Sequence, residues 1–241
     1  MMVSDVAGTT IDAVEIPFIV GGKKYIFVDT AGLRRSSRRD EDLEIISAFK
    51  SQEAIRRSDL VLLVVDATIG PTEQDAKIMQ AILEDHRGVI LVANKSDLGE
   101  KEIPEFKKTF RAQMDRTFHF FEDVPVVFTS AKMRHGLGDL YDLVQKVSDK
   151  LTFKVPTGEL NDFFFDTIRK APAPVWGNNN VKFYYLTQTM QKPPAFIAFA
   201  NHPDGVTPSY RRFLIKHIKD RWNLQGIPIR IFCMKSRSKG G

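Results

Sequence analysis

Four apolar segments, each followed directly by a short polar motif, constrain the fold of this chain more than any other feature. One segment feeds the motif D-T-A-G at 29–32, and a later one feeds N-K-S-D at 94–97. Helical periodicity at 71–84, 104–114 and 138–151 separates the later segments, which is typical of right-handed βαβ units. A further helix is expected at 41–57, and Thr72 is the expected N-cap of the helix at 71–84. The carboxyl ends of parallel strands meet at one sheet edge, so these motifs are expected to converge there. The sequence therefore predicts an α/β domain with a mostly parallel, doubly wound sheet, preceded by an antiparallel hairpin with a turn at 21–22.

The N-K-S-D tetrapeptide has the chemistry needed to read guanine. The carboxylate of Asp97 can accept hydrogen bonds from the N1–H and the exocyclic amine, which guanine presents and adenine lacks. Asn94 can bond the purine edge, and Lys95 can lie along the ring. Adenine would leave a desolvated carboxylate unpaired, at a cost of about 1–3 kcal/mol. The same letters also occur where a helix simply begins with Asp as its cap, but the accompanying motifs in the right order favour GTP and GDP as ligands.

Residues near the other motifs are expected to complete the nucleotide site. Ser130, Ala131 and Lys132 follow the segment 126–128 and are predicted to join the base-binding residues. Asp29 is predicted to act on Mg²⁺ through a water, because Mg²⁺ keeps several waters and takes few carboxylates. The backbone N–H of Gly32 can meet the γ-phosphate, where any side chain would block the approach.

Thr10 is the expected hydroxyl ligand of Mg²⁺, engaged only when the γ-phosphate is present. Residues 4–12 would then form a switch loop. An ordinary turn at 8–10 is the alternative, and the position of this segment before the 21–22 hairpin favours the switch.

One element of such a site is missing from the 241 residues. The motif G-x-x-x-x-G-K-[ST] does not occur, so the phosphate-binding loop is absent together with the strand before it and the helix after it. That strand would lie in the middle of the sheet, and its loss would leave backbone groups of its neighbours unpaired. Because Met1 and Met2 directly precede the first motif, we expect the chain to be a fragment of a longer protein that binds GTP weakly or not at all by itself.

Charge divides the chain at about residue 152. Residues 1–152 hold 21 Lys and Arg against 25 Asp and Glu, a net charge of −4, whereas residues 153–241 hold 14 against 5, a net charge of +9. After a linker at 155–158, the pattern changes to helix, two strands, helix and strand. The sequence therefore predicts a GTPase domain at 1–152 and a small α+β domain with a three-stranded sheet at 153–241. The basic domain indicates a polyanion such as ribosomal or messenger RNA, with a well-solvated basic surface as the alternative.

The predicted helix 207–223 carries the candidate phosphate contacts. One face is expected to pack on the sheet, and basic side chains occupy the rest: Arg211, Arg212, Lys216, Lys219 and Arg221. Contacts of this kind weaken steeply as salt rises. An alternative role for the domain, compatible with RNA contact, is to pack against GTPase domains and transmit the nucleotide state.

The compartment follows from what the chain lacks. No apolar run reaches the roughly 20 residues that a membrane helix needs, and no secretory signal begins the chain. The single cysteine, Cys233, excludes an internal disulfide and favours a reducing compartment. The family resemblance given below implies bacterial cytoplasm or an organelle of bacterial descent as the location.

The motif set resembles a translation-factor-type small GTPase, and one position narrows the resemblance. Leu33 stands where many GTPases carry a glutamine that orients the attacking water. The segments 4–10 and 29–34 together look like the potassium-assisted bacterial GTPases. The basic second part looks like that of the Der (EngA) family, double-GTPase ribosome-assembly factors whose second GTPase domain is followed by a KH-like domain. The resemblance covers essentially the whole chain.

This resemblance implies further ligands and partners. It implies GTP hydrolysis with K⁺ held by Ser4, Val6 and Thr9 in place of an arginine finger, where a cation neutralises charge developing on the leaving oxygen. It also implies a preceding GTPase domain, the large ribosomal subunit and ribosomal RNA as partners. The G-x-x-G loop by which KH modules clamp RNA does not occur, and 177–180 is expected to be only a loop. The alternative function is a nucleotide-independent RNA-binding or adaptor remnant with the shape of a GTPase.

Overall fold

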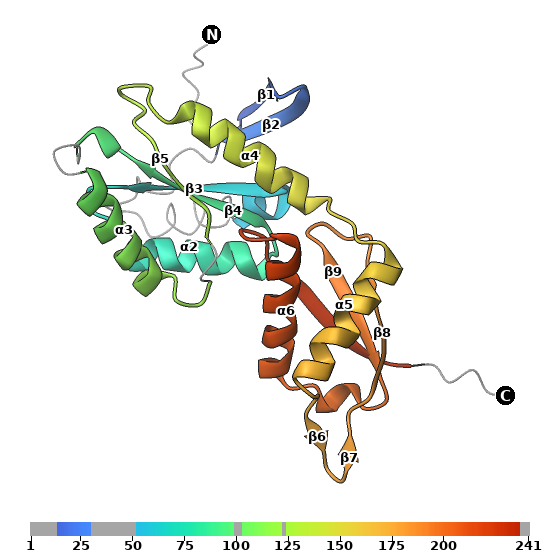
Figure 1. Ribbon diagram of the computed structural model, residues 1–241. Helices are drawn as coiled ribbons and strands as arrows, with labels where there is room; N and C mark the ends of the chain where they lie inside the picture. Colours follow the sequence, from blue (N-terminus) through green and yellow to red (C-terminus); the bar gives the residue numbers. More distant parts are fainter. Residues whose placement is uncertain (1–13, 30–51, 99–102, 122–123, 237–241) are drawn as a thin grey trace. The chain divides into compact units, whose positions relative to one another are not determined.

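The computed structural model describes residues 14–29, 52–98, 103–121 and 124–236 (Figure 1). The chain forms two compact units, Met1–Ser58 and Asp59–Gly241. No helix within the described ranges combines the length and the apolar composition needed to cross a bilayer.

The first unit contains the predicted hairpin. Strand β1 (Val14–Val20) pairs antiparallel with β2 (Lys23–Asp29). Both turn residues have positive φ, 54° at Gly21 and 77° at Gly22, which glycine tolerates and which suits the twist of a two-residue hairpin. Of the helix predicted at 41–57, the structure describes residues 52–57, which are helical, and the remainder lies outside the described residues.

The second unit begins with a parallel sheet. Strands β3 (Leu60–Asp66), β4 (Gly88–Asn94) and β5 (Val126–Phe128) lie in the order β3-β4-β5. Helix α4 (Leu137–Leu151) covers one face, and α2 (Glu73–Glu84) and α3 (Ile103–Thr117) lie on the other (Figure 1). Residues 88–93 of β4 are all buried, as expected for a strand covered on both faces. This confirms the predicted doubly wound α/β architecture.

Helix α2 shows how local sequence sets an element boundary. The hydroxyl of Thr72 accepts a hydrogen bond from the N–H of Asp75, and the carboxylate of Asp75 accepts from the N–H of Thr72 at 2.9 Å. This reciprocal pair satisfies two backbone donors that the first turn leaves open. Met79 and Ile82 are fully buried on the face toward the sheet. The predicted N-cap at Thr72 is therefore confirmed.

The basic part of the chain has the predicted three-stranded sheet. Helix α5 (Thr157–Lys170) precedes β8 (Phe183–Gln188) and β9 (Ala195–Ala200), and α6 (Pro208–Trp222) precedes β10 (Arg230–Lys235). The strand order is β10-β9-β8, with β9 parallel to β10 and antiparallel to β8. Asn161 of α5 accepts from the N–H of Leu186 at 2.8 Å and donates to its carbonyl at 2.9 Å, which ties α5 to β8.

Two short elements add to the predicted set. The segment expected to be only a loop at 177–180 belongs to a small hairpin, β6 (Val175–Trp176) paired with β7 (Asn179–Asn180). A single 3₁₀ turn, η2 (Pro203–Gly205), follows β9. Both are too short for periodicity in the sequence to reveal them.

The basic part contacts the parallel sheet at the edge where β4 and β5 begin, which is opposite to the motif edge. The N–H of Val89 donates to the carbonyl of Gly226 at 3.2 Å, and Nζ of Lys150 donates to the carbonyl of Gln225 at 3.4 Å. Burial, and then the neighbouring Lys219, lower the pKa of Lys150. The predicted boundary at 152/153 falls between α4 and α5, inside this one compact unit.

Substitution of Gly226 measures how much the contact between the basic part and the parallel sheet contributes to stability. Its φ is +79°, and a Cβ there would lie against Cγ of Pro125 and 2.8 Å from its Cδ. Gly177 has a similar φ of +59° with nothing within 4 Å, so it is a matched control. We expect Gly177→Ala to lower the free energy of unfolding by about 1–2 kcal/mol from backbone strain alone. Gly226→Ala should lower the free energy of unfolding by more, as measured by urea denaturation. Equal losses in the two variants would show that the junction accommodates the added Cβ without a cost in stability.

Candidate nucleotide-binding site

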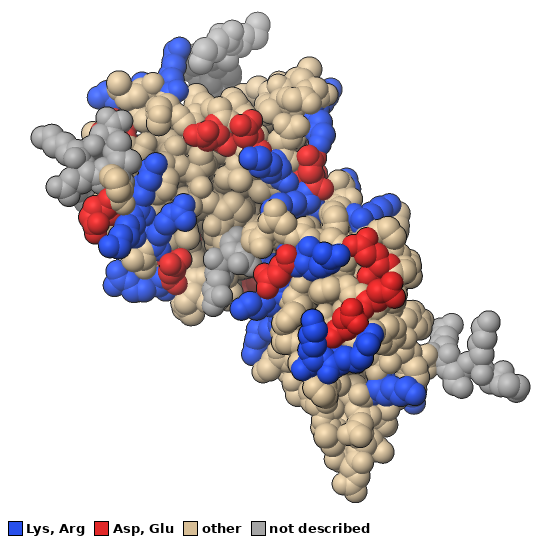
Figure 2. All heavy atoms as spheres, in the orientation of Figure 1, with Lys and Arg blue, Asp and Glu red and all other residues tan. Residues whose placement is uncertain are grey.

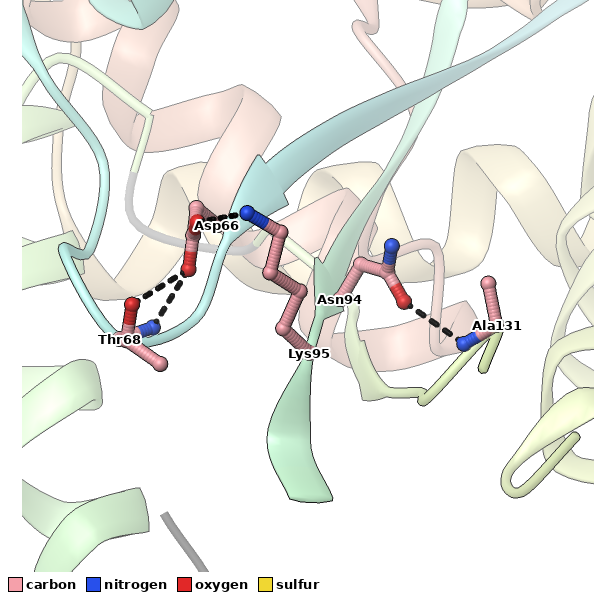
Figure 3. Close-up of polar contacts among 5 residues, drawn as sticks. All are labelled: Asp66, Thr68, Asn94, Lys95 and Ala131. Carbon is pink, nitrogen blue, oxygen red and sulfur yellow. Dashed lines mark hydrogen bonds and ion pairs between the residues drawn. The ribbon is translucent and has the colours of Figure 1, made fainter. Parts of the chain in front are cut away.

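The polar motifs that the sequence placed after β4 and β5 lie at one sheet edge (Figure 3). The strand register places Asp66, the last residue of β3, beside Asn94, the last residue of β4. It also places Ala93 beside Phe128, the last residue of β5. The side chains that follow these strands are therefore neighbours, as the parallel-sheet argument predicts.

Asn94 ties the loops after β4 and β5 together. Its Oδ1 accepts from the N–H of Ala131 at 3.0 Å and from the hydroxyl of Thr129 at 3.4 Å (Figure 3). Within the described residues, its Nδ2 has no hydrogen-bond partner. This fixes the amide orientation with the acceptor turned inward, so the donor remains for a ligand acceptor such as a purine nitrogen.

The loop after β5 is closed by its own hydrogen bonds. Ser130 and His135 exchange backbone hydrogen bonds at 3.0 and 3.1 Å, and Oγ of Ser130 accepts from the N–H of Met133 at 3.0 Å. Ser130 is buried, whereas Ala131 and Lys132 at the tip are exposed. Ser130 therefore stabilises the loop from its buried side, and Ala131 and Lys132 are the residues that a ligand could reach.

Asp97 has the environment expected of a base-reading carboxylate. It lies in a single 3₁₀ turn at 96–98, which begins after Lys95 with φ of 64°. The N–H of Ser96 donates to the carbonyl of Thr129 at 3.0 Å, which holds this turn against the loop after β5. Asp97 is half-buried, and its carboxylate has no hydrogen-bond or ion-pair partner in the part of the chain that is described. A partly desolvated carboxylate without a donor fits a ligand that supplies two N–H groups.

Lys95 and Asp66 form an ion pair beside this turn. Nζ of Lys95 lies 2.6 Å from Oδ2 of Asp66, while Oδ1 of Asp66 accepts from the hydroxyl of Thr68 at 2.7 Å and its N–H at 3.0 Å (Figure 3). The hydrogen bond from Lys95 and then those from Thr68 lower the pKa of Asp66 to about 2. The partner of Lys95 was not predicted from the sequence, although an aspartate that ends a strand in register with Asn94 is a signal for one.

Several predicted site residues lie outside the described residues. They are Ser4, Val6, Thr9, Thr10 and Gly32, which were expected to hold K⁺, Mg²⁺ and the γ-phosphate. Asp29 is the last residue of β2, and its side chain also lies outside the description.

The five basic residues predicted on α6 do not share one environment. Arg212, Lys216 and Arg221 are exposed, and Arg221 lies 3.7 Å from Glu159 of α5. Arg211 is half-buried beside Cys233, whose pKa is raised by burial and lowered by Arg211. Lys219 is only 7% exposed, with Nζ 4.6 Å from the ring centroid of Phe121. Burial at the junction thus removes Lys219 from the surface that RNA could reach, because α6 is covered there by the first part of the unit as well as by its own sheet.

Two family models match the chain. Residues 1–95 match a model described as 50S ribosome-binding GTPase, and residues 154–233 match one described as KH-domain-like of EngA bacterial GTPase enzymes, C-terminal.

Curated relatives align with nearly all of the chain. GTPase Der from Geobacillus thermodenitrificans is 42% identical over 96% of this chain and 53% of its own length. GTPase Der from Caldanaerobacter subterraneus subsp. tengcongensis is 37% identical over 98% of this chain and 53% of its own length. The chain therefore spans about half the length of the curated relatives it matches. Among solved structures, Era from Aquifex aeolicus bound to GDP·AlF₄⁻ is 17% identical over 97% of this chain and 84% of its own, with a TM-score of 0.48.

The ion pair predicts a measurable change in the titration of Asp66. Because the folded pKa lies below the ordinary 3.8, the pair stabilises the fold above that pH and this contribution is lost as pH falls toward 2. We expect Lys95→Ala to raise the pKa of Asp66 toward 3.8, as measured by carboxyl ¹³C NMR. The control Lys132→Ala removes an exposed lysine from the next loop and should leave Asp66 unchanged. An unshifted Asp66 in Lys95→Ala would show that Thr68 alone sets its pKa.

Proposed function

The chain belongs to the Der (EngA) family of GTPases, and we propose that it supplies the guanine-binding site of a GTP-hydrolysing factor that acts in assembly of the large ribosomal subunit. One observation carries the proposal. The half-buried carboxylate of Asp97 and the amide donor of Asn94 lie unpaired, among the described residues, on loops held together by hydrogen bonds. A guanine base supplies the matching donors and acceptor.

Base selection follows from the cost of leaving these groups unmatched. Guanine offers two N–H donors to Asp97, whereas adenine offers none at those positions. A site that hydrogen-bonds a ligand N–H group rejects a ligand that lacks this donor more strongly than it rejects one that is merely smaller. Lys95 can support the ring through its aliphatic stem while its ammonium group stays on Asp66.

We propose that the phosphate end of the site uses residues outside the described part. Thr10 and Asp29 would hold Mg²⁺, Gly32 would meet the γ-phosphate, and Ser4, Val6 and Thr9 would hold K⁺. Their hydroxyl, carboxylate and backbone oxygens are hard donors that suit both cations. When bound, the cations neutralise charge on the phosphates.

Hydrolysis is proposed for a longer polypeptide, because no G-x-x-x-x-G-K-[ST] motif occurs in the 241 residues. That polypeptide would supply this motif and a preceding GTPase domain. Faster GTP turnover by it in KCl than in NaCl would support the potassium assignment, and equal rates would contradict it.

Ribosomal RNA of the large subunit is the proposed macromolecular partner. The net charge of +9 on residues 153–241 supplies the attraction to phosphate, and Arg212, Lys216 and Arg221 of α6 remain accessible. The proposed location is accordingly the bacterial cytoplasm or an organelle of bacterial descent, where ribosomes of this kind are assembled.

A second candidate function is a nucleotide-independent adaptor that binds RNA and keeps only the GTPase shape. The absence of the phosphate-binding motif from these residues favours it. The two functions differ in one observable, the preference for guanine over adenine nucleotides.

Asp97→Ala should remove that preference. We expect the chain to bind GDP weakly but more tightly than ADP, and the substitution to reduce the ratio of the two dissociation constants about 5- to 100-fold, because the buried acceptor is lost. Ligand-observed NMR with GDP and ADP at high concentration measures both constants. The control Asp139→Ala removes an exposed carboxylate from the first turn of α4 and should preserve the ratio.

Two results would count against the nucleotide function. Asp97→Ala with an unchanged ratio would show that another group reads the base. Wild-type protein with no preference for GDP would favour the adaptor.

A further inference from the structure

The sheet of the basic domain has one face that the helices do not cover. Helices α5 and α6 lie on one side of it (Figure 1), where Phe196, Ala198 and Leu186 are fully buried. On the other side, Phe232 is 41% exposed, Tyr185 is 42% exposed and Met234 is 49% exposed. The solvent-facing side of such a sheet normally carries polar residues. We call this side the open sheet face and define it by Tyr185, Thr187, Ile197, Phe199, Phe232 and Met234.

The register arranges the open sheet face as two rows across the three strands. Phe199 of β9 lies between Tyr185 of β8 and Met234 of β10, and Ile197 lies between Thr187 and Phe232. The rings of Tyr185 and Phe199 stack with centroids 4.3 Å apart and planes at 21°. Successive rows on one face of a strand are about 7 Å apart. The Tyr185–Phe199 pair in one row and Phe232 in the next therefore lie on the same face of the sheet.

Basic groups border this surface. The guanidinium of Arg230 lies 5.3 Å from the ring centroid of Phe232 and is held there by a hydrogen bond of 2.8 Å to Oε1 of Gln191. Nζ of Lys182 lies 5.9 Å from the ring centroid of Tyr184, which is itself exposed beside Tyr185.

The acidic residues of the domain are segregated from the sheet. No Asp or Glu occurs at 167–203 or at 221–241, which include all three strands. The five acidic residues of the domain lie on its helical elements: Glu159, Asp162 and Asp166 on α5, Asp204 on η2 and Asp220 on α6. Figure 2 shows acidic side chains over α5, interspersed with basic ones. The segments that contain the strands thus carry positive charge without an acidic residue of their own.

We propose that the open sheet face binds single-stranded nucleic acid by stacking unpaired bases on Tyr185 and Phe232. Aromatic faces stack with any base, and Arg230 and Lys182 are placed to meet the phosphates between them. Double-stranded RNA buries its base faces and cannot use such a surface. A protein partner would require acidic groups to match this border, whereas a nucleic acid supplies them as phosphates. The inference rests on the proposed RNA-binding function but assigns it to the sheet rather than to α6.

Alanine substitutions of the rings test the stacking. Anisotropy of a fluorescein-labelled oligouridylate, titrated with the whole chain, measures single-strand affinity. We expect Phe232→Ala and Tyr185→Ala each to weaken binding about 5- to 100-fold, because one stacked base is lost. Tyr185→Phe keeps the ring and should bind as the wild type does. The control Phe120→Ala removes a ring of matched exposure, 42%, from the first part of the unit and should have no effect.

Salt dependence separates stacking from charge. Phe232→Ala should leave the slope of log affinity against log salt unchanged, since no charge is removed. Lys182→Ala should flatten that slope by about 0.7, the change for one lost phosphate contact on a single strand. Because these side chains are exposed, circular dichroism should show each variant folded, so that lost binding reports the surface itself.

Three outcomes would overturn the stacking proposal. If both alanine variants bound the single strand as the wild type does, RNA would contact the protein through its phosphates alone. A preference of the wild type for a duplex of the same length over the single strand would exclude stacking. A wild-type dimer that Phe232→Ala converts to a monomer in sedimentation would assign the face to a second copy of the chain. The ratio of the GDP and ADP dissociation constants, which tests Asp97, is measured without RNA. Failure of the guanine site and failure of this surface are therefore distinguishable.

Discussion

Burial of β4 on both faces is the constraint on which the rest of the second unit depends. A strand paired on both sides and covered above and below has one acceptable register, because a slip by one residue would turn its side chains to the opposite faces. That register puts Asn94 beside Asp66 and next to the residue that follows Phe128. The hydrogen bonds from Asn94 to Thr129 and Ala131 are then a consequence of strand pairing rather than of the loops themselves. The candidate site needs this fixed frame, since its side chains come from the ends of β3, β4 and β5 and from the loops after them.

The same strand organises the opposite edge of the sheet. Val89, at the start of β4, donates to Gly226, which lies between α6 and β10. The seven residues of β4 span about 23 Å, so one rigid element carries the candidate base site at one end and the basic domain at the other. Lys219 and Lys150 show that this junction is more than a point contact, because one is buried against Phe121 and the pKa of the other is lowered by burial. A distortion of β4 large enough to move Asn94 would also disturb the bond to Gly226.

Local sequence predicted those features that local interactions determine. The Gly21-Gly22 turn, the Thr72 cap and the three-stranded basic sheet are confirmed, because turn chemistry, capping and periodicity act over a few residues. The convergence of the N-K-S-D motif with the loop after β5 was also predictable, from the topology of parallel sheets. The pairing of Lys95 with Asp66 and the burial of Lys219 were not predicted. Both join residues far apart in sequence, and the periodicity of α6 alone does not show that Phe121 covers one of its basic side chains.

The open sheet face shows why charge should be read by element rather than by domain. The net charge of +9 on residues 153–241 favoured phosphate contacts on α6, where five basic residues share one helix. In the fold, that helix loses Lys219 to the junction, turns Arg211 toward Cys233, and places Arg221 near Glu159. The strands carry fewer basic residues than α6 but no acidic ones, so no residue of the strands themselves cancels their positive charge. Exposed rings on a solvent face would ordinarily favour aggregation, and uncompensated positive charge around them opposes self-association while attracting a polyanion. Rings and charge together therefore select an occupant that is both aromatic and negatively charged.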